Sequence, residues 1–241
     1  MNSQESPATH ASRLVTSLFP DALGAVLGGS AAQGRATATS DLDVAVLLPD
    51  SGTTGREVRC HEGRPVELFL TALADVPEFF AWDSARRRGT VLFIYAEGLP
   101  VLDRDGHLAR TCAQARDVLA AGPPPLTPAE RERSRYGLTC FMDDLADVAR
   151  DDRYEQLACA DFTLREAAHL LTAHHNAWSG VGRWLPRRLL DADPALGKAL
   201  LDGHRAVAER ADPGPLTAAA EQVLDLFGGP LREGYVHRWR P

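Results

Sequence analysis

The sequence contains a single lysine, Lys198, so arginine makes up almost all of its basic residues, a bias that we attribute to base composition. Long apolar runs are also missing. The longest, from Val91 to Ala96, is far shorter than the roughly 18 residues that a membrane-spanning helix needs. Only four cysteines occur; they lie far apart and lack the spacing of a zinc site. These absences exclude a membrane span and a disulfide scaffold, and they favour reduced, buried thiols.

An excess of basic charge is absent as well. The net charge is -7 and the isoelectric point is about 5.6. A nucleic-acid-binding protein usually carries a basic stripe, and binding to an anionic membrane also needs positive charge. The segment from Met1 to Arg13 is polar and lacks the apolar stretch of a signal peptide. We therefore expect a cytoplasmic protein with neither nucleic acid nor membrane as a partner.

Prolines divide the 241 residues into two halves of different composition. Apolar alternation typical of strands occurs only before Pro123, whereas helical patterns fill the chain after Pro125. Thr127, a proline and then Glu130 have the spacing of a capping box, which predicts the start of a helix. We expect a mixed α/β domain at residues 1–122, a linker at 123–126 and an all-helical domain at 127–241.

Two strand patterns in the first half matter for function. Residues 41–48 alternate, with four aliphatic side chains on one face and Asp41, Asp43 and Ala45 on the other, which predicts a strand with one buried face. Residues 57–70 read as a hairpin with its turn at Glu62 and Gly63. A stretch of small residues, 31–39, precedes the first of these strands and is expected to be flexible.

Asp41 and Asp43 form an acidic pair on that first strand. Residues two apart point to the same side, about 6.6 Å from each other at the usual rise of a strand. Two carboxylates at that distance repel by about 2.5 kcal/mol at an effective dielectric constant near 20. A divalent cation bound to both would convert this repulsion into attraction. Oxygen ligands suit Mg²⁺, which completes its coordination shell with water and substrate phosphates.

A third carboxylate and a glycine-serine loop extend this pattern. Glu67 lies mid-strand, and it joins the acidic pair if its strand lies beside residues 41–48. Gly29 and Ser30 allow backbone amides and a hydroxyl to approach phosphate oxygens closely. A P-loop is excluded, because Arg35 and its neighbour replace the lysine and hydroxyl which that loop requires. The pattern predicts two-metal phosphoryl or nucleotidyl transfer.

These segments resemble the nucleotidyltransferase superfamily typified by DNA polymerase beta. That family carries a glycine-serine pair, then an acidic pair on a strand, then a later acidic residue between apolar ones. The resemblance implies an α+β fold, with a small mixed β-sheet flanked by helices in residues 1–122. It implies that Asp41 and Asp43 bind the metal, and that Glu67 completes this catalytic metal site or acts as the general base. Mg²⁺, in a two-metal site, and ATP or another nucleoside triphosphate are the implied cofactor and co-substrate.

The resemblance also implies nucleotide-binding residues. Gly29 and Ser30 would hold phosphate, and Ser40 directly precedes the acidic pair. Members of the family often carry arginine where Gln33 stands here, and Arg35 is the nearest replacement. Arg183 lies in an aromatic and basic segment of the second half, which could bind the base or the triphosphate.

The two-domain organisation resembles the aminoglycoside and lincosamide nucleotidyltransferases. These enzymes transfer a nucleoside monophosphate to an antibiotic hydroxyl, and their helical domain helps to bind the acceptor. The resemblance implies a small-molecule hydroxyl acceptor and a substrate-binding role for residues 127–241. Two alternatives stay open: transfer to a protein side chain, as in antitoxin-type nucleotidyltransferases, and a non-catalytic nucleotide-binding module. The sequence does not name the acceptor, the preferred nucleotide or the oligomeric state.

Overall fold

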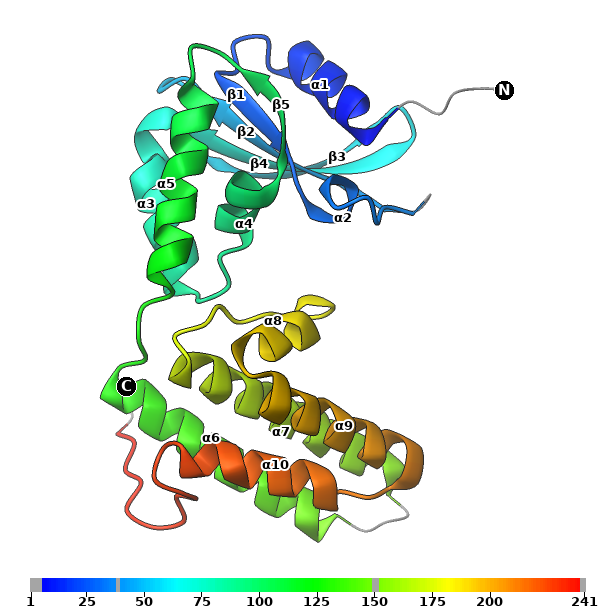
Figure 1. The fold of residues 1–241 in the computed structure, drawn as a ribbon, viewed down its shortest axis with the longest axis vertical. Helices are drawn as coiled ribbons and strands as arrows, with labels where there is room; N and C mark the ends of the chain where they lie inside the picture. Colours follow the sequence, from blue (N-terminus) through cyan, green and yellow to red (C-terminus); the bar gives the residue numbers. More distant parts are fainter. Residues whose placement is uncertain (1–5, 38–39, 149–151, 239–241) are drawn as a thin grey trace. The chain divides into compact units, whose positions relative to one another are not determined.

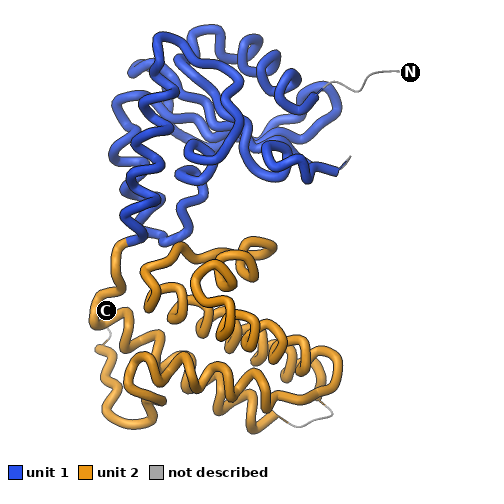
Figure 2. Tube along the Cα trace, in the orientation of Figure 1, with its two compact units in different colours: residues 1–123 blue, residues 124–241 orange. Residues whose placement is uncertain are grey.

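The computed structural model describes residues 6–37, 40–148 and 152–238. The chain forms two compact units, residues 1–123 and 124–241, which Figure 2 shows in different colours. The division between them falls inside the run of prolines from Pro123 to Pro125. Each unit has its own buried apolar core, and the two are described separately.

A five-stranded sheet forms the centre of the first unit (Figure 1). Its strands, in chain order, are β1 (Gly24–Leu27), β2 (Leu42–Leu48), β3 (Gly55–His61), β4 (Arg64–Ala72) and β5 (Leu99–Asp103). In space their order is β3-β4-β2-β1-β5. Strands β2 and β4 are parallel, whereas the other neighbours are antiparallel. The sheet is therefore mixed, and the predicted α+β fold class is confirmed.

Helices cover both faces of this sheet (Figure 1). They are α1 (Pro7–Leu18), α2 (Gly29–Ala32), α3 (Val76–Ala85), α4 (Thr90–Glu97) and α5 (His107–Ala121), with a 3₁₀ turn at Leu73–Asp75. On one face, Ala11, Leu14 and Val15 of α1 are buried together with apolar side chains of β1, β2 and β4. On the other face, α3, α4 and α5 pack against the sheet. The apolar stripe of α1 thus fixes this helix to the strands that carry the predicted site.

Strand β2 is buried on both faces along most of its length, so the expectation of a single buried face is wrong. Ala45 and Leu47 are fully buried, because α4 packs against this strand. Asp43 is the one residue of β2 that is half-buried, and Asp41 directly precedes the strand. Apolar alternation along one strand carries no information about a helix that covers its second face. The open part of that face is therefore confined to the end of the strand that carries the two aspartates.

The predicted hairpin is confirmed as β3 and β4. Glu62 and Gly63 form its two-residue turn with φ angles of 52° and 77°. Positive φ at both positions is the geometry that matches the twist of the two strands. Strand β3 lies at the edge of the sheet, and Val58 on it is 75% exposed. The hairpin therefore presents an open edge strand, whereas β4 is buried between β3 and β2.

The stretch of small residues before β2 contains regular structure at its start, which corrects the expectation of a flexible segment from residue 31 onward. The short helix α2 spans Gly29–Ala32, and Ala31 is buried against the core of the first unit. The backbone N–H of Arg35 then donates to the carbonyl of Ser30 at 2.9 Å. Residues 38 and 39 of this stretch lie outside the described residues.

The second unit is helical throughout its described regular structure, as predicted. Its helices are α6 (Pro128–Asp147), α7 (Arg153–His174), α8 (Trp184–Ala192), α9 (Pro194–Arg210) and α10 (Gly214–Asp225). Leucines such as Leu138, Leu171 and Leu200 form its core and are fully buried. The predicted capping box is present: the Glu130 amide donates to Thr127 Oγ1, and the Thr127 amide donates to Glu130 Oε2. Both interactions satisfy amides that would otherwise lack partners at the start of α6.

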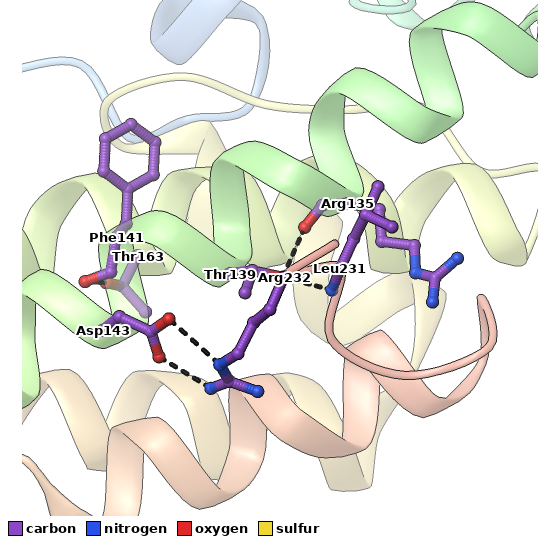
Figure 3. Close-up of polar contacts among 7 residues, drawn as sticks. All are labelled: Arg135, Thr139, Phe141, Asp143, Thr163, Leu231 and Arg232. Atoms are coloured by element: carbon purple, nitrogen blue, oxygen red, sulfur yellow. Dashed lines mark hydrogen bonds and ion pairs between the residues drawn. The ribbon is translucent and has the colours of Figure 1, made fainter. Parts of the chain in front are cut away.

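The segment that follows α10 returns to α6 and is held there by polar contacts (Figure 3). Arg232 binds Asp143 through two hydrogen bonds, at 2.7 and 3.2 Å. The backbone N–H of Leu231 donates to Thr139 Oγ1 at 3.0 Å. Because Asp143 already binds Arg232, one of the acidic side chains of the second unit has a structural role within that unit.

None of the described helices is long and apolar enough to cross a membrane. All four cysteines are free thiols. The expectation that they are buried holds only for Cys112, since Cys60 is exposed and Cys140 and Cys159 are half-buried. Cys60 lies on the edge strand β3, where the structure leaves side chains uncovered.

A buried carboxylate fixes the start of α4, which in turn packs against the loop that follows β1. Asp83 is 3% exposed, and its carboxylate accepts from the amides of Thr90, Val91 and Leu92 at 2.8 to 3.2 Å. Burial raises the pKa of Asp83 above its ordinary value, although these three amides oppose the shift. Ile94 on the same helix lies where a side chain at Gly28 would go.

We expect Asp83→Ala to lower the free energy of unfolding by about 2 kcal/mol, because it leaves buried amides without partners. Asp83→Asn tests the raised pKa. A folded-state pKa above the unfolded value gives stability that is present below about pH 4 and is lost as pH rises through the folded pKa. The advantage of the wild type over Asp83→Asn should therefore shrink as pH rises. Urea denaturation at several pH values measures it, and an advantage that grows with pH would contradict the shift.

Candidate active site

The parallel pairing of β2 and β4 brings the predicted carboxylates together. Asp43 and Glu67 are directly paired in the register of these strands, and Asp41 lies two residues before Asp43. One carboxylate oxygen from each of the three lies within 4.8 Å of the others. All three residues are half-buried. The sequence predicted that Glu67 joins the two aspartates if its strand lies beside residues 41–48. The pairing of β2 with β4 meets this condition.

This cluster is electrostatically costly without a cation. Two carboxylates 4.8 Å apart repel by about 3.5 kcal/mol at an effective dielectric constant near 20. Arg56 on the edge strand β3 forms an ion pair with Glu67 and offers one positive charge to the cluster. The Arg56 side chain is 66% exposed, so solvent weakens this pair. Three oxygen donors at this spacing are a ligand set that suits Mg²⁺.

The backbone at Gly29 is shaped around Asp43. Gly29 has a φ of +60°, a conformation that glycine adopts at little cost. A Cβ atom at this position would lie only 1.8 Å from Asp43 Oδ2. The amide of Gly28 also donates to the Asp43 carbonyl at 2.7 Å. The glycine pair therefore holds the loop after β1 directly against the carboxylate of Asp43.

Ser30 follows in the same loop. Its Oγ atom is buried and has no hydrogen-bond partner among the residues that the structure describes. Leaving a buried hydroxyl without a partner costs about 1–3 kcal/mol, so such an atom needs an explanation. A phosphate oxygen bound at this loop would supply the missing partner.

Comparison with known proteins gives a family match for the part of the chain that carries this arrangement. Residues 12–91 match the family model of the nucleotidyltransferase domain. These residues form a nucleotidyltransferase domain. Among solved structures, a nucleotidyltransferase-like protein from Exiguobacterium sibiricum 255-15 has 18% sequence identity and a TM-score of 0.43, over 89% of this chain and 73% of that one. A search of curated proteins gave no significant match.

The matched residues of the nucleotidyltransferase domain include all three carboxylates and the loop that carries Gly29 and Ser30. They extend from α1 through β4 to the start of α4. The match covers a third of the chain and does not extend to the second unit. Nucleotidyl transfer is therefore the general activity that this domain supports, and the roles of individual residues stay predictions.

Two predicted nucleotide-binding residues, Arg35 and Ser40, shortly precede Asp41 in the sequence. Ser40 Oγ accepts from the backbone amide of Thr37 at 2.9 Å, so its side chain turns back into its own loop. Arg35 is exposed, five residues beyond Ser30, and no resolved contact ties its guanidinium to the carboxylates in the described part of the chain. Both assignments stay predictions.

The remaining predicted nucleotide-binding residue, Arg183, lies in the second unit. It is exposed and directly precedes α8. In the same segment, Trp178 is 8% exposed and belongs to the buried residues of that unit. Trp184 is half-buried, and the guanidinium carbons of Arg187 and Arg188 lie 4.8 and 5.3 Å from its ring centroid. In this segment, Trp178 therefore has a packing role, whereas Trp184 lies beside two arginine side chains.

Two arginines near the cluster were missed by sequence reasoning. Arg56 pairs with Glu67, and its guanidinium lies 5.3 Å from the centroid of the Phe69 ring. Arg64 Nε donates to the carbonyl of Ser40 at 3.2 Å, which fixes the residue before Asp41. Arg56 lies one residue before the predicted hairpin of residues 57–70, and extending the pairing about its turn by that residue places Arg56 opposite Phe69, as in the structure. That register was the signal that could have identified Arg56.

Proposed function

We propose that this protein transfers a nucleoside monophosphate from a nucleoside triphosphate to a hydroxyl group of a small molecule. The reaction would require Mg²⁺ and release pyrophosphate. The observation that carries the proposal is the direct pairing of Asp43 with Glu67 in parallel strands, with Asp41 beside them. The buried, unpartnered Ser30 hydroxyl supports a phosphate site next to this cluster.

The residues of the first unit divide the work as follows. Asp41, Asp43 and Glu67 would hold Mg²⁺, which neutralises charge on the triphosphate when bound. Ser30 Oγ and the amides of the loop at Gly29 would hold phosphate oxygens. The acceptor oxygen forms a bond to the α-phosphorus as the bond to the pyrophosphate oxygen breaks. Glu67, or a carboxylate of the second unit, would take the proton that the acceptor hydroxyl loses.

The acceptor is proposed to be cationic or polar and small. The net charge of -7 favours a cationic molecule over a nucleic acid. Aminoglycosides, which carry several ammonium groups and hydroxyls, fit this description, and lincosamides are the second class to test. The helical second unit, which has its own core, would bind the acceptor.

The test is a matrix of donors and acceptors. Purified protein is incubated with Mg²⁺ and each of ATP, GTP, CTP and UTP, with and without each aminoglycoside and lincosamide. Pyrophosphate release and the mass of the acceptor are both measured. We expect release that depends on one acceptor class, a mass increase of one nucleoside monophosphate, and loss of both when EDTA removes the metal.

Three other results would contradict parts of the proposal. A mass increase on a co-expressed protein, with no small molecule modified, would contradict the proposed acceptor and favour protein modification. Mg²⁺-dependent binding of a nucleoside triphosphate without release for any acceptor in the matrix would favour a non-catalytic module. Absence of such binding altogether would overturn the proposal.

A further inference from the structure

A second cluster of metal-ligating side chains lies outside the carboxylate site. It consists of His10, His61 and Glu62, and one potential ligand atom from each lies within 4.8 Å of the others. His10 comes from α1, whereas His61 ends β3 and Glu62 begins the hairpin turn. The two histidines are half-buried and Glu62 is exposed. We propose that these three residues bind one divalent transition-metal ion of the zinc class, which joins α1 to the β3–β4 hairpin.

The distance between the two imidazoles carries this proposal. His61 Nδ1 and His10 Nε2 are 3.0 Å apart, and their ring planes meet edge-on at 79°. Two nitrogen ligands bonded to tetrahedral zinc at about 2.0–2.1 Å are separated by about 3.3–3.4 Å. The observed pair is therefore within a few tenths of an ångström of the separation required in a zinc site. The same nitrogens can share one proton in a hydrogen bond, which is the competing explanation.

Both histidines are held in place by structure that does not depend on a metal. The apolar side of α1, including Ala11 and Leu14, is buried against the sheet core, which sets the position of His10. His61 is paired with Arg64 in the ladder of β3 and β4. A ligand pair that is already positioned loses little conformational entropy when it binds an ion.

The third ligand completes a set that selects zinc over magnesium. Imidazole nitrogens suit zinc and its neighbours, whereas magnesium prefers oxygen ligands only. Glu62 forms an ion pair with Arg13 on α1, next to His10 along the helix surface. One carboxylate oxygen can bind the ion while the other keeps this arginine, which is the kind of outer contact that orients metal ligands. Two histidines and one carboxylate leave a fourth position for water.

Binding of this ion would act on stability. His10 and His61 are 51 residues apart in the sequence, so the ion would link two segments that are distant in the unfolded chain. A ligand that binds only the folded state stabilises it according to its concentration and affinity. At a free zinc concentration 100 times the dissociation constant, we expect the Tm of the full chain to rise by about 5–10 °C.

The experiment uses the whole 241-residue chain with Asp43→Asn, so that zinc bound at the carboxylate site is not mistaken for zinc bound by His10, His61 and Glu62. After treatment with EDTA and dialysis, ZnCl₂ is titrated by calorimetry and the Tm is followed in parallel. We expect one ion per chain. His10→Gln and His61→Gln should each weaken binding by at least about 100-fold, since loss of an outer-sphere partner alone costs 10–100-fold. Glu62→Gln, which leaves both imidazoles in place, is expected to weaken binding as well.

The matched control is His204→Gln on α9, in the other unit, which should leave both the affinity and the Tm rise unchanged. Millimolar Mg²⁺ should not reproduce the Tm rise. The proposal is overturned if zinc gives no Tm rise, or if the two histidine variants bind zinc as tightly as their parent. In either case the imidazole pair is a hydrogen bond and no more. Neither result bears on nucleotidyl transfer, because the two sites share no residue.

Discussion

Asp43→Asn is expected to abolish nucleotidyl transfer while making the protein without metal more stable. The substitution keeps the shape of the side chain and removes one charge from a cluster whose oxygens lie within 4.8 Å of one another. Without Mg²⁺, loss of a repulsion of about 3.5 kcal/mol per pair, before screening by solvent, should raise the free energy of unfolding. With Mg²⁺ and nucleotide, loss of this proposed metal ligand should lower kcat by at least about 10³-fold, or about 4 kcal/mol.

The opposite signs of the two effects make the prediction specific to a functional cluster. Replacing a carboxylate with a structural role would lower both the stability and the activity of the protein. Replacing a carboxylate that binds metal would lower the activity but raise the stability of the metal-free protein. Asp117→Asn on α5, which changes an exposed carboxylate of the same unit, is the matched control and should alter neither quantity. Pyrophosphate release measures the first effect, and denaturation with and without Mg²⁺ measures the second. Full activity of Asp43→Asn would show that the carboxylates have been assigned wrongly.

The sequence alone predicted the strands that carry this site, because their signals are local. Alternation of apolar residues identified 41–48, and the turn at Glu62 and Gly63 identified the hairpin. The pairing of β2 with β4 is not local. Strand β3 lies between β2 and β4 in the sequence, and no property of β2 or β4 alone specifies its neighbour in the sheet. From the sequence, the convergence of Asp43 with Glu67 could be predicted only on the condition that their strands are neighbours. The fold shows that they are.

Contacts across distant elements account for the remaining differences. The second face of β2 is covered by α4, and the apolar run from Val91 to Ala96 within that helix does not reveal which strand it covers. Likewise, His10 and His61 show no common pattern in the chain, since a helix and a hairpin bring them together. Spacing rules identify metal ligands that share one element, and they miss ligands that tertiary packing assembles.

Gly29→Ala is expected to inactivate the enzyme through Asp43, although Gly29 has no side chain of its own. The new Cβ would lie 1.8 Å from Asp43 Oδ2 and 2.8 Å from its Cγ, so the carboxylate has to move away. Its departure would remove a proposed metal ligand from the cluster with Asp41 and Glu67. We expect kcat/KM for the nucleoside triphosphate to fall at least about 100-fold, with a higher Mg²⁺ concentration needed for half-maximal rate.

Gly34→Ala is the control that separates the effect of backbone strain from the effect of the clash with Asp43. Gly34 lies five residues further along the chain, just beyond the short helix α2, with a φ of +65°, close to the +60° of Gly29, but a Cβ there meets no atom within 4 Å. Both variants carry the same backbone strain, about 1–2 kcal/mol for a left-handed alanine. Only Gly29→Ala adds the clash with Asp43. Equal losses of activity in the two variants would mean that loop strain alone is responsible. Loss confined to Gly29→Ala would show that activity depends on the close approach of the loop to this carboxylate.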